Sequence, residues 1–210
     1  MQFDLLDPVN NQILDAKTYA DFKRALIDSQ CTKCSLSQNR HNIVVDRGNP
    51  EAKVLMVGEA PGENEDLQGK AFVGRAGKLL DSMMLEVGID TNQDTLIANV
   101  AKCRPPENRA PKQEEVDACM PFLKKQISLL KPNFIVLLGA TAFRHLIRDK
   151  GDFKMAKEVG RPFTHPEYPG ANLMVLYHPA YILRDPRKKP LMLEHLKTLK
   201  SLLQQKNLLQ

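Results

Sequence analysis

The hydrophobic positions of the chain follow two alternating patterns. Short continuous apolar runs, typical of strands buried on both faces of a sheet, cover residues 53–57, 95–100, 133–138 and 172–177. Elsewhere apolar residues recur at helical spacing, which predicts helices over residues 15–29, 75–87, 112–130, 140–148 and 191–203. Residues 149–169 are polar and contain several glycines and prolines, so we expect a loop with a short hairpin there.

Strands that alternate with helices predict an α/β fold, in which helices cover both faces of a parallel sheet. Because the crossovers between parallel strands are right-handed, the carboxyl ends of all the strands meet at one edge of the sheet. That edge collects residues 58–62, residues 99–109, Gly139 and residues 178–184. We therefore expect the functional site at this edge.

The stretch of residues 58–81 has the most unusual composition. A turn rich in glycine and proline follows the first strand, then come an acidic run (residues 63–66), Phe72 with glycines on both sides, and a helix. A strand that leads into a glycine-rich loop and a helix forms a ligand crevice in open α/β sheets. The N–H groups at the helix start would suit an anion such as a DNA phosphate. The stretch matches neither GxGxxG nor GxxxxGK[ST], so it predicts neither a dinucleotide nor a nucleoside triphosphate site.

Length and composition set the outer bounds. A chain of 210 residues suits a single domain, residues 1–210, with a sizeable core. No apolar run reaches the roughly 18 residues that cross a membrane. The first ten residues lack the apolar centre of a signal peptide, so we expect a cytoplasmic protein without a membrane partner. The net charge of +5 permits a polyanionic partner, although charge alone is more typical of a mildly basic soluble protein.

Four cysteines form two closely spaced pairs, C-x2-C and C-x15-C, at Cys31, Cys34, Cys103 and Cys119. A reducing cytoplasm disfavours structural disulfides. Thiolates clustered in this way usually hold zinc or an iron–sulfur centre. The spacing alone slightly favours zinc, and two unrelated pairs of free thiols remain an alternative.

Several segments, together with this cysteine spacing, resemble family 4 uracil-DNA glycosylases. They read GEAPGENEDLQGKAFVGRAGKLLD, NVAKCRPPENRAP, LLGATA and HPAYILR, and they occur in order from Cys31 to the last helix. The resemblance implies a three-layer α/β/α sandwich around a four-stranded parallel sheet. It also implies a structural [4Fe–4S] cluster, which replaces zinc as the expected centre. The implied ligands are Cys31, Cys34, Cys103 and Cys119.

Three residues would handle a uracil base that has left the DNA stack. Phe72 offers a ring for stacking, although a single Phe is more often part of a core. The Asn99 amide can accept from uracil N3–H and donate to O4, although an Asn near a strand end is more often a turn former. By the resemblance, His178 donates a hydrogen bond to uracil O2 as negative charge develops there. Ala60 and Gly62 would line the same pocket.

The group that activates water is less clear from the sequence. Glycosylases of related families carry Asp or Asn at the position of Ala60, so this chain lacks that base. Glu65 is the preferred candidate to orient water or to stabilise an oxocarbenium-like sugar. By the resemblance, Glu59 shapes the loop and contacts the pocket. The alternative is that the acidic run only hydrates a loop.

The remaining candidates would hold DNA, single- or double-stranded. Backbone N–H groups at the helix start and two arginines are expected to contact phosphates; they belong to Gly74, Ala76, Gly77, Arg109 and Arg184. Arg104 and the basic residues 187–189 could neutralise further phosphates, although residues 187–189 equally suit a solvated surface. We expect the segment of residues 180–184 to form a loop that enters the duplex, with Tyr181, Ile182 or Leu183 as the wedge.

The expected activity is hydrolysis of uracil from DNA by a monomeric enzyme, without a lyase step. One alternative is a protein that binds uracil-DNA without turnover. Relatives that trap the sugar covalently carry a His-bearing insert after the second strand, and residues 104–111 contain no His. The other alternative is a non-catalytic metal module in a larger assembly.

Overall fold

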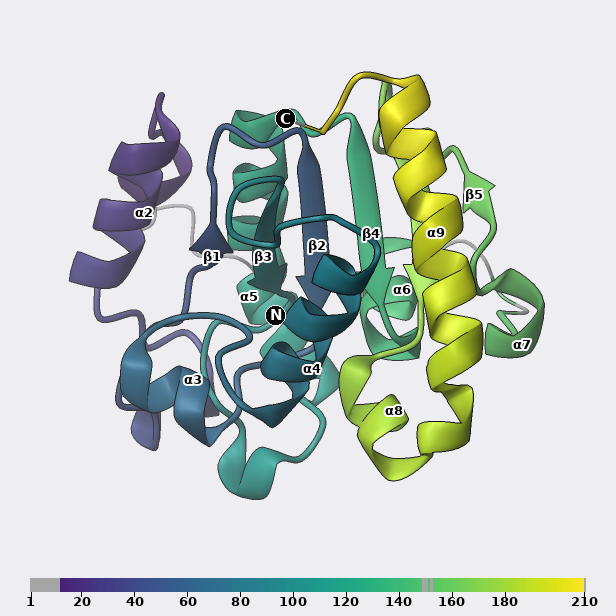
Figure 1. Ribbon diagram of the computed structural model, residues 1–210. Coiled ribbons are helices and arrows are strands. Elements are labelled where there is room, and N and C mark those ends of the chain that lie inside the picture. Colours follow the sequence, from purple (N-terminus) through teal and green to yellow (C-terminus); the bar gives the residue numbers. More distant parts are fainter. Residues whose placement is uncertain (1–11, 149–150, 152, 210) are drawn as a thin grey trace.

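The computed structural model describes residues 12–148, 151 and 153–209 (Figure 1). The first 11 residues, where we expected no signal peptide, lie outside this range. A six-stranded sheet in the order β1-β3-β2-β4-β6-β5 forms the centre of the molecule. Its four inner strands are parallel and run in the predicted segments: β2 (Val54–Gly58), β3 (Thr95–Asn99), β4 (Phe134–Leu138) and β6 (Asn172–Leu176).

Two very short edge strands were not predicted as part of the sheet. β1 (Arg47–Gly48) pairs antiparallel with β3, and β5 (Pro162–Phe163) pairs antiparallel with β6. Each has only two residues, too few for an alternating pattern to be visible in the sequence. β5 lies in residues 149–169, but it pairs with β6, which follows that segment, rather than with a second strand inside it as the expected short hairpin would require; three residues of the segment lie outside the described range.

Helices cover both faces of the sheet, as the α/β/α prediction requires. Alternate side chains of each inner strand point to opposite faces: Val54 and Met56 pack with α4 (Arg75–Glu86) and α9 (Lys189–Gln205), whereas Leu55 and Val57 pack with α5 (Gln113–Leu130) and α6 (Ala140–Leu146). Figure 1 shows α4 and α9 in front of the sheet and α5 and α6 behind it. These four helices match the predicted ones to within a few residues.

A third hydrophobic cluster lies beside the sheet. It joins α2 (Tyr19–Asp28), which is capped by Thr18, to the short turn η1 (Ser35–Gln38) and to Phe122 of α5. Cys103 belongs to the same cluster. The helix predicted over residues 15–29 thus places the first cysteine pair next to the second.

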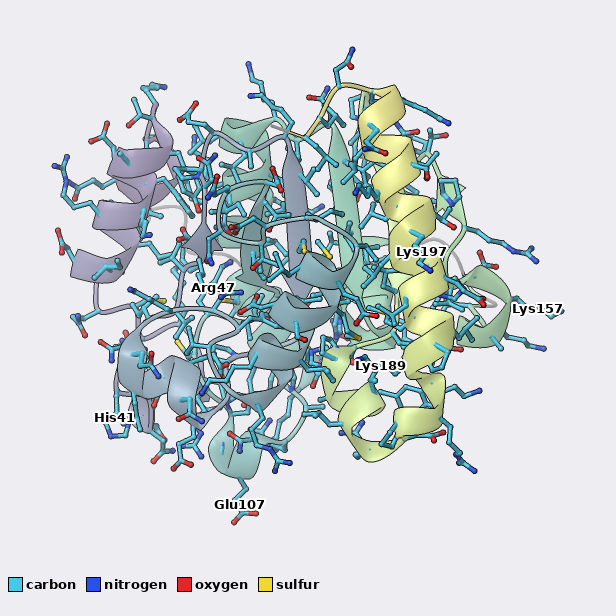
Figure 2. All side chains as sticks on the ribbon, in the orientation of Figure 1. His41, Arg47, Glu107, Lys157, Lys189 and Lys197 are labelled. Carbon is cyan, nitrogen blue, oxygen red and sulfur yellow. The ribbon has the colours of Figure 1, made fainter. Side chains whose placement is uncertain are left out.

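Three helices correct the prediction of loops. The acidic run folds into α3 (Glu63–Gln68), Met155–Glu158 forms α7, and Pro179–Arg184 forms α8. Two further turns, η2 (Pro106–Asn108) and η3 (Pro186–Lys188), lie in expected loops. α3 and α8 sit at the carboxyl edge of the sheet, the lower edge in Figure 1, and Glu107 of η2 projects into solvent there (Figure 2). Within the described residues, no helix is both long enough and apolar enough to span a bilayer.

Candidate active site

A cavity of about 930 Å³ opens at the carboxyl edge of the sheet. Its walls come from the β2–α4 connection, the end of β3, the loop around η2, Gly139 and α8. Most of the predicted pocket and DNA-binding residues line it, but Gly77, Arg104, Arg187 and Lys189 do not. Those that do are Glu59, Ala60, Gly62, Glu65, Phe72, Gly74, Ala76, Asn99, Arg109, His178, Arg184 and Lys188. The topology therefore brings together residues that are more than 100 positions apart in the sequence.

Gly58 lets the Phe72 ring and the Asn99 amide meet on the floor of the cavity. A Cβ atom on Gly58 would lie 2.5 Å from both Asn99 Oδ1 and Phe72 Cζ. Phe72 itself has a φ of +54°, a left-handed conformation that is costly for a bulky side chain and typical of functional sites. Its ring packs in the core cluster on one side and borders the cavity on the other, so stacking and packing are both available to it.

Gly77 does not line the cavity. A Cβ atom at Gly77 would lie 1.7 Å from the carbonyl oxygen of Phe72. Glycine is therefore required because α4 passes directly against the Phe72 backbone. This close packing explains why the position is glycine.

Asn99 presents an unused acceptor to the cavity. The residue is 1% exposed, and its Oδ1 has no hydrogen-bond partner among the described residues. A buried amide oxygen without a partner costs about 1–3 kcal/mol. Such an atom beside a cavity can accept a hydrogen bond from a donor group that enters it.

His178 is the N-cap of α8 and lies close to Phe72. Its Nδ1 accepts a hydrogen bond from the Ala180 N–H at 3.1 Å, so the ring proton resides on Nε2. Burial, assisted by the nearby positive charge of Arg184, lowers the pKa of His178 to about 4. The centroids of the Phe72 and His178 rings are 5.7 Å apart. The site therefore contains a neutral imidazole with a defined tautomer.

The two candidate carboxylates differ in their surroundings. Glu65 accepts hydrogen bonds from the Gly74 N–H at 2.6 Å and from the Gly62 N–H at 3.2 Å, so it ties together the two ends of the loop. The Gly74 N–H, which we expected to face a phosphate, thus donates to Glu65 instead. The Glu59 carboxylate borders the cavity and, within the described part of the chain, makes no hydrogen bond or ion pair. Of the two, Glu59 is the one with free oxygens.

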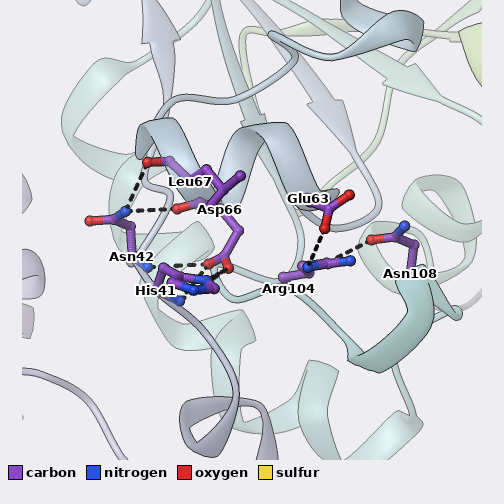
Figure 3. Close-up of polar contacts among 7 residues, drawn as sticks. All are labelled: His41, Asn42, Glu63, Asp66, Leu67, Arg104 and Asn108. Atoms are coloured by element: carbon purple, nitrogen blue, oxygen red, sulfur yellow. Dashed lines mark hydrogen bonds and ion pairs between the residues drawn. The ribbon is translucent and has the colours of Figure 1, made fainter.

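The other acidic residues of α3 hold the helix in place (Figure 3). Asp66 is fully buried and accepts from the backbone N–H groups of His41 and Asn42, with a further contact to the His41 ring at 2.7 Å. Glu63 pairs with Arg104 at 3.6 Å, and Arg104 Nε donates to Asn108 Oδ1. α3 is therefore fastened to the segment before β1 and to the loop after β3.

The two arginines predicted to bind DNA have different partners. Arg109 forms a bidentate ion pair with Glu115, whose side chain is fully buried, at 2.7 and 2.9 Å. Glu115 also accepts from Ser35 Oγ and from the Lys112 N–H, and these bonds, led by that with Arg109, lower its pKa to about 2. Arg184 is exposed at the rim and forms no ion pair within the described residues. Its charge is thus the freer of the two.

The four cysteines line a second, small pocket, which we call the thiol pocket (Cys31, Cys34, Cys103 and Cys119). All four thiols are free. Two N–H groups point at sulfur: the Lys102 backbone N–H donates to Cys119 Sγ at 3.3 Å, and Arg40 Nη1 donates to Cys103 Sγ at 3.7 Å. Burial raises the pKa values of Cys103 and Cys119 to about 12. Among the residues that can be described, no three Cys, His, Asp or Glu side chains close around a single metal ion.

Sequence reasoning missed two buried residues next to these sites, Lys102 and Glu115. Lys102 follows β3 and is 1% exposed, and Glu115 begins α5. A charged residue in a polar segment is normally assigned to the surface, so composition gave no indication of their burial. The Lys112 N–H at the helix start donates to the Glu115 side chain at 2.7 Å, but the Lys-x-x-Glu spacing is not the signature of a capping box, so it gave no warning either.

The carboxyl edge of this α/β/α sandwich therefore holds a ring, an amide and an imidazole around one cavity. A profile of the family described as the uracil DNA glycosylase superfamily matches residues 45–200. The chain belongs to this superfamily.

Type-4 uracil-DNA glycosylases are among its relatives. The protein from Sulfurisphaera tokodaii is 40% identical over 82% of this chain and 80% of its own length. The protein from Thermotoga maritima is 44% identical over 74% of this chain and 79% of its own, and that from Saccharolobus solfataricus is 40% identical over 84% and 83%.

Proposed function

We propose that the protein is a monofunctional uracil-DNA glycosylase, which hydrolyses the N-glycosidic bond of a flipped-out deoxyuridine and leaves an abasic site. The observation that carries the proposal is the unpartnered Asn99 Oδ1 beside the Phe72 ring in the cavity that His178 borders. This set supplies an aromatic face, an acceptor for an imide N–H and a neutral donor. The similarity to type-4 uracil-DNA glycosylases supports the same activity.

In the reaction, the bond between C1′ and N1 breaks and its electron pair leaves with uracil. The His178 Nε2–H donates to O2, where part of this charge collects. A water oxygen bonds to C1′, and the water proton is finally carried by the departing base or by solvent. A neutral imidazole suffices because the uracil anion is already stabilised by its two carbonyl groups.

The amide of Asn99 would select uracil over cytosine. Oδ1 accepts from N3–H and Nδ2 donates to O4, whereas cytosine presents the opposite donor and acceptor pattern. The Phe72 ring stacks on the base, which contributes about 1–3 kcal/mol. Both residues contact Gly58, so their relative positions are fixed by the end of β2.

α8 would supply the group that enters the DNA. Of the three wedge candidates, Ile182 is buried in the core and Tyr181 packs on Tyr177, with ring centroids 5.3 Å apart. Leu183 borders the cavity and is 38% exposed, so we assign the wedge to Leu183. Arg184, next to it, and the remaining N–H groups at the start of α4, including that of Ala76, would contact phosphates. The Arg109 charge, paired with Glu115, would contribute less.

We assign the water-orienting role to Glu59 rather than to Glu65, because both oxygens of Glu65 already accept backbone N–H groups. Glu59→Gln should lower kcat by about a hundredfold, the lower end of the range for a positioned general base. Glu65→Gln should instead lower the free energy of unfolding by about 1 kcal/mol, through loss of one charged acceptor. Single-turnover kinetics and thermal unfolding of both variants make the comparison. A larger kcat loss in Glu65→Gln would return the role to Glu65.

The donor set of the thiol pocket suits a [4Fe–4S] cluster. Cys31, Cys34, Cys103 and Cys119 would be its ligands, and two N–H groups already point at their sulfur atoms, as they do around iron–sulfur clusters. When bound, the cluster would supply structural cross-linking between the segment after α2, the end of β3 and α5.

We further propose that the chain is one domain and acts as a monomer in the cytoplasm, where reduced thiols persist.

Cys103→Ala should weaken or abolish the brown colour and visible absorption of the purified protein, because one of four thiolate ligands is lost. Iron and acid-labile sulfide analysis of wild type and variant, purified without oxygen, gives the measurement. Colourless wild-type protein with one bound zinc ion would contradict the assignment of a cluster.

The activity itself is tested with oligonucleotides that contain one uracil, in U:G, U:A and single-stranded form. Abasic sites are detected as alkali-labile breaks on a gel. We expect one free uracil for each abasic site, and no protein–DNA adduct that persists in SDS. A stable adduct would identify a protein that traps its substrate, and neither product nor adduct would leave a binding module.

A further inference from the structure

Lys102 is among the largest fully buried side chains and lies three residues after Asn99. Its ammonium donates to three oxygens from three separate segments. They are the Asn99 carbonyl at 2.9 Å, Gln126 Oε1 at 2.6 Å and the Val45 carbonyl at 3.4 Å. Since an ammonium has three N–H groups, its donors are fully used, and none of the acceptors is a carboxylate.

The cost of burying this charge indicates that it has a purpose. A buried cation is unfavourable unless it is hydrogen-bonded and compensated by negative charge. Compensation comes through a chain of side chains: Gln126 Nε2 donates to Tyr19 Oη at 2.6 Å, and Tyr19 donates to Asp46. The backbone N–H of Lys102 donates in turn to Cys119 Sγ in the thiol pocket. Lys102 thus connects the interior of the molecule to both sites.

The ammonium contacts the residue whose side chain faces the cavity. Asn99 is the last residue of β3, and beyond it Val100 and Ala101 donate to the Gly58 and Glu59 carbonyls, each at 3.0 Å. The end of β3 is therefore held by the β2 loop through these two N–H groups and by Lys102 through the Asn99 carbonyl. Without the ammonium, that carbonyl would lose its 2.9 Å hydrogen bond, the one recorded for it outside the strand ladder among the described residues.

We propose that Lys102 is a positioning residue for base recognition: its ammonium holds the Asn99 carbonyl, and with it the direction of the Asn99 amide. The inference rests on the proposed function and extends it to a residue outside the cavity. Because a displacement of about 1 Å can cost two orders of magnitude in an oriented site, a hydrogen bond to the backbone of the reading residue affects affinity for the base.

Free uracil, used as a competitive inhibitor, reports on the pocket without contributions from DNA. Lys102→Met removes the ammonium and keeps the chain length, and Lys23→Met is the matched control. Lys23 is half-exposed and pairs with Asp46 at 2.7 Å in the same network, but it does not contact Asn99. We expect the inhibition constant for uracil to rise about tenfold in Lys102→Met, the loss of one charged hydrogen bond, and to stay at the wild-type value in Lys23→Met.

Two further measurements separate positioning from a general structural effect. Iron content is determined for every sample, and affinity for uracil-free DNA is measured by competition. An inhibition constant that rises only in proportion to lost iron, or equally in both variants, overturns the proposal. So does an unchanged constant in a folded Lys102→Met.

If Lys102→Met does not fold, Gln126→Leu replaces it. This change keeps the ammonium but removes the Gln126 oxygen, at 2.6 Å one of the acceptors that hold the ammonium in place beside the Asn99 carbonyl. The inhibition constant should then rise about threefold, as for a weaker hydrogen bond, and an unchanged value overturns the proposal. Wild-type protein that neither releases nor binds uracil would contradict the proposed function itself. That outcome differs from an active wild type whose inhibition constant for uracil does not change when Lys102 is replaced, which contradicts only the role of Lys102.

Discussion

Replacing His178 by alanine is expected to lower the turnover number for uracil removal by about 10²–10³-fold, while affinity for DNA changes little. The Nε2–H acts on charge that appears on O2 only as the glycosidic bond breaks, so its loss affects the transition state rather than binding. Single-turnover kinetics gives the rate, and a gel-shift titration with an oligonucleotide that lacks uracil gives the affinity. An equal loss of rate and affinity would contradict this role.

His178→Asn serves as the control for the fold. Asparagine is a good N-cap, so it can replace Nδ1 as acceptor for the Ala180 N–H but cannot reach the base. We expect Asn and Ala to reduce turnover alike, and only Ala to destabilise α8.

The pH dependence gives a second check on His178. A pKa lowered to about 4 means that the imidazole stays neutral at any pH well above 4, so its contribution to turnover should be constant from pH 5 to 8. Only as the pH approaches 4 is Nδ1 protonated, which removes the acceptor of the Ala180 N–H, so the wild-type rate should fall on this account only there. A loss of rate as the pH rises through about 6.5, the ordinary pKa of His, would indicate that the charged imidazole is the active form and contradict the proposal.

Asn99→Asp is expected to lower kcat/KM for uracil-containing DNA by about four orders of magnitude, as for loss of a hydrogen-bond match in a site built for it. The carboxylate cannot donate to O4 and repels it. Cytosine, whose amino group donates, should at the same time become a better competitor. For both proteins, kcat/KM is measured on a uracil-containing oligonucleotide, and a cytosine-containing oligonucleotide is tested as a competitor.

Asn49→Asp provides a matched control, because this partly exposed Asn donates to the Gln93 carbonyl and does not line the cavity. It should leave discrimination between the two bases at the wild-type level. Should Asn99→Asp also discriminate as the wild type does, Asn99 is not the reader of the base.

The parallel sheet could be predicted because its strands are continuous apolar runs that only burial on both faces explains. β4, the FIVLL run, is found at the predicted position within one residue. The position of His178 after β6 followed from the same pattern, and right-handed crossovers then placed it beside Asn99 and Phe72 at one edge. The shared cavity was therefore a consequence of topology.

The details of the loops depend on contacts between distant residues and could not be predicted. α3 is held by Asp66 through bonds to His41, 25 residues earlier, and Glu65 bonds to Gly74, nine residues later. In the sequence these carboxylates form one acidic run with no indication of separate tasks. For α8 a local signal existed, since Pro179 at the first helical position favours a helix start.

The clamp that Glu65 forms between Gly62 and Gly74 exists in the protein before DNA arrives. The conformational entropy of the loop that carries Phe72 is therefore lost when the protein folds, and not when it binds DNA. A free nucleobase or a very short oligonucleotide should therefore bind to the same preformed pocket as a long duplex. Small heterocycles can then be ranked against it directly, as fragments, to map which ring substituents the enzyme tolerates.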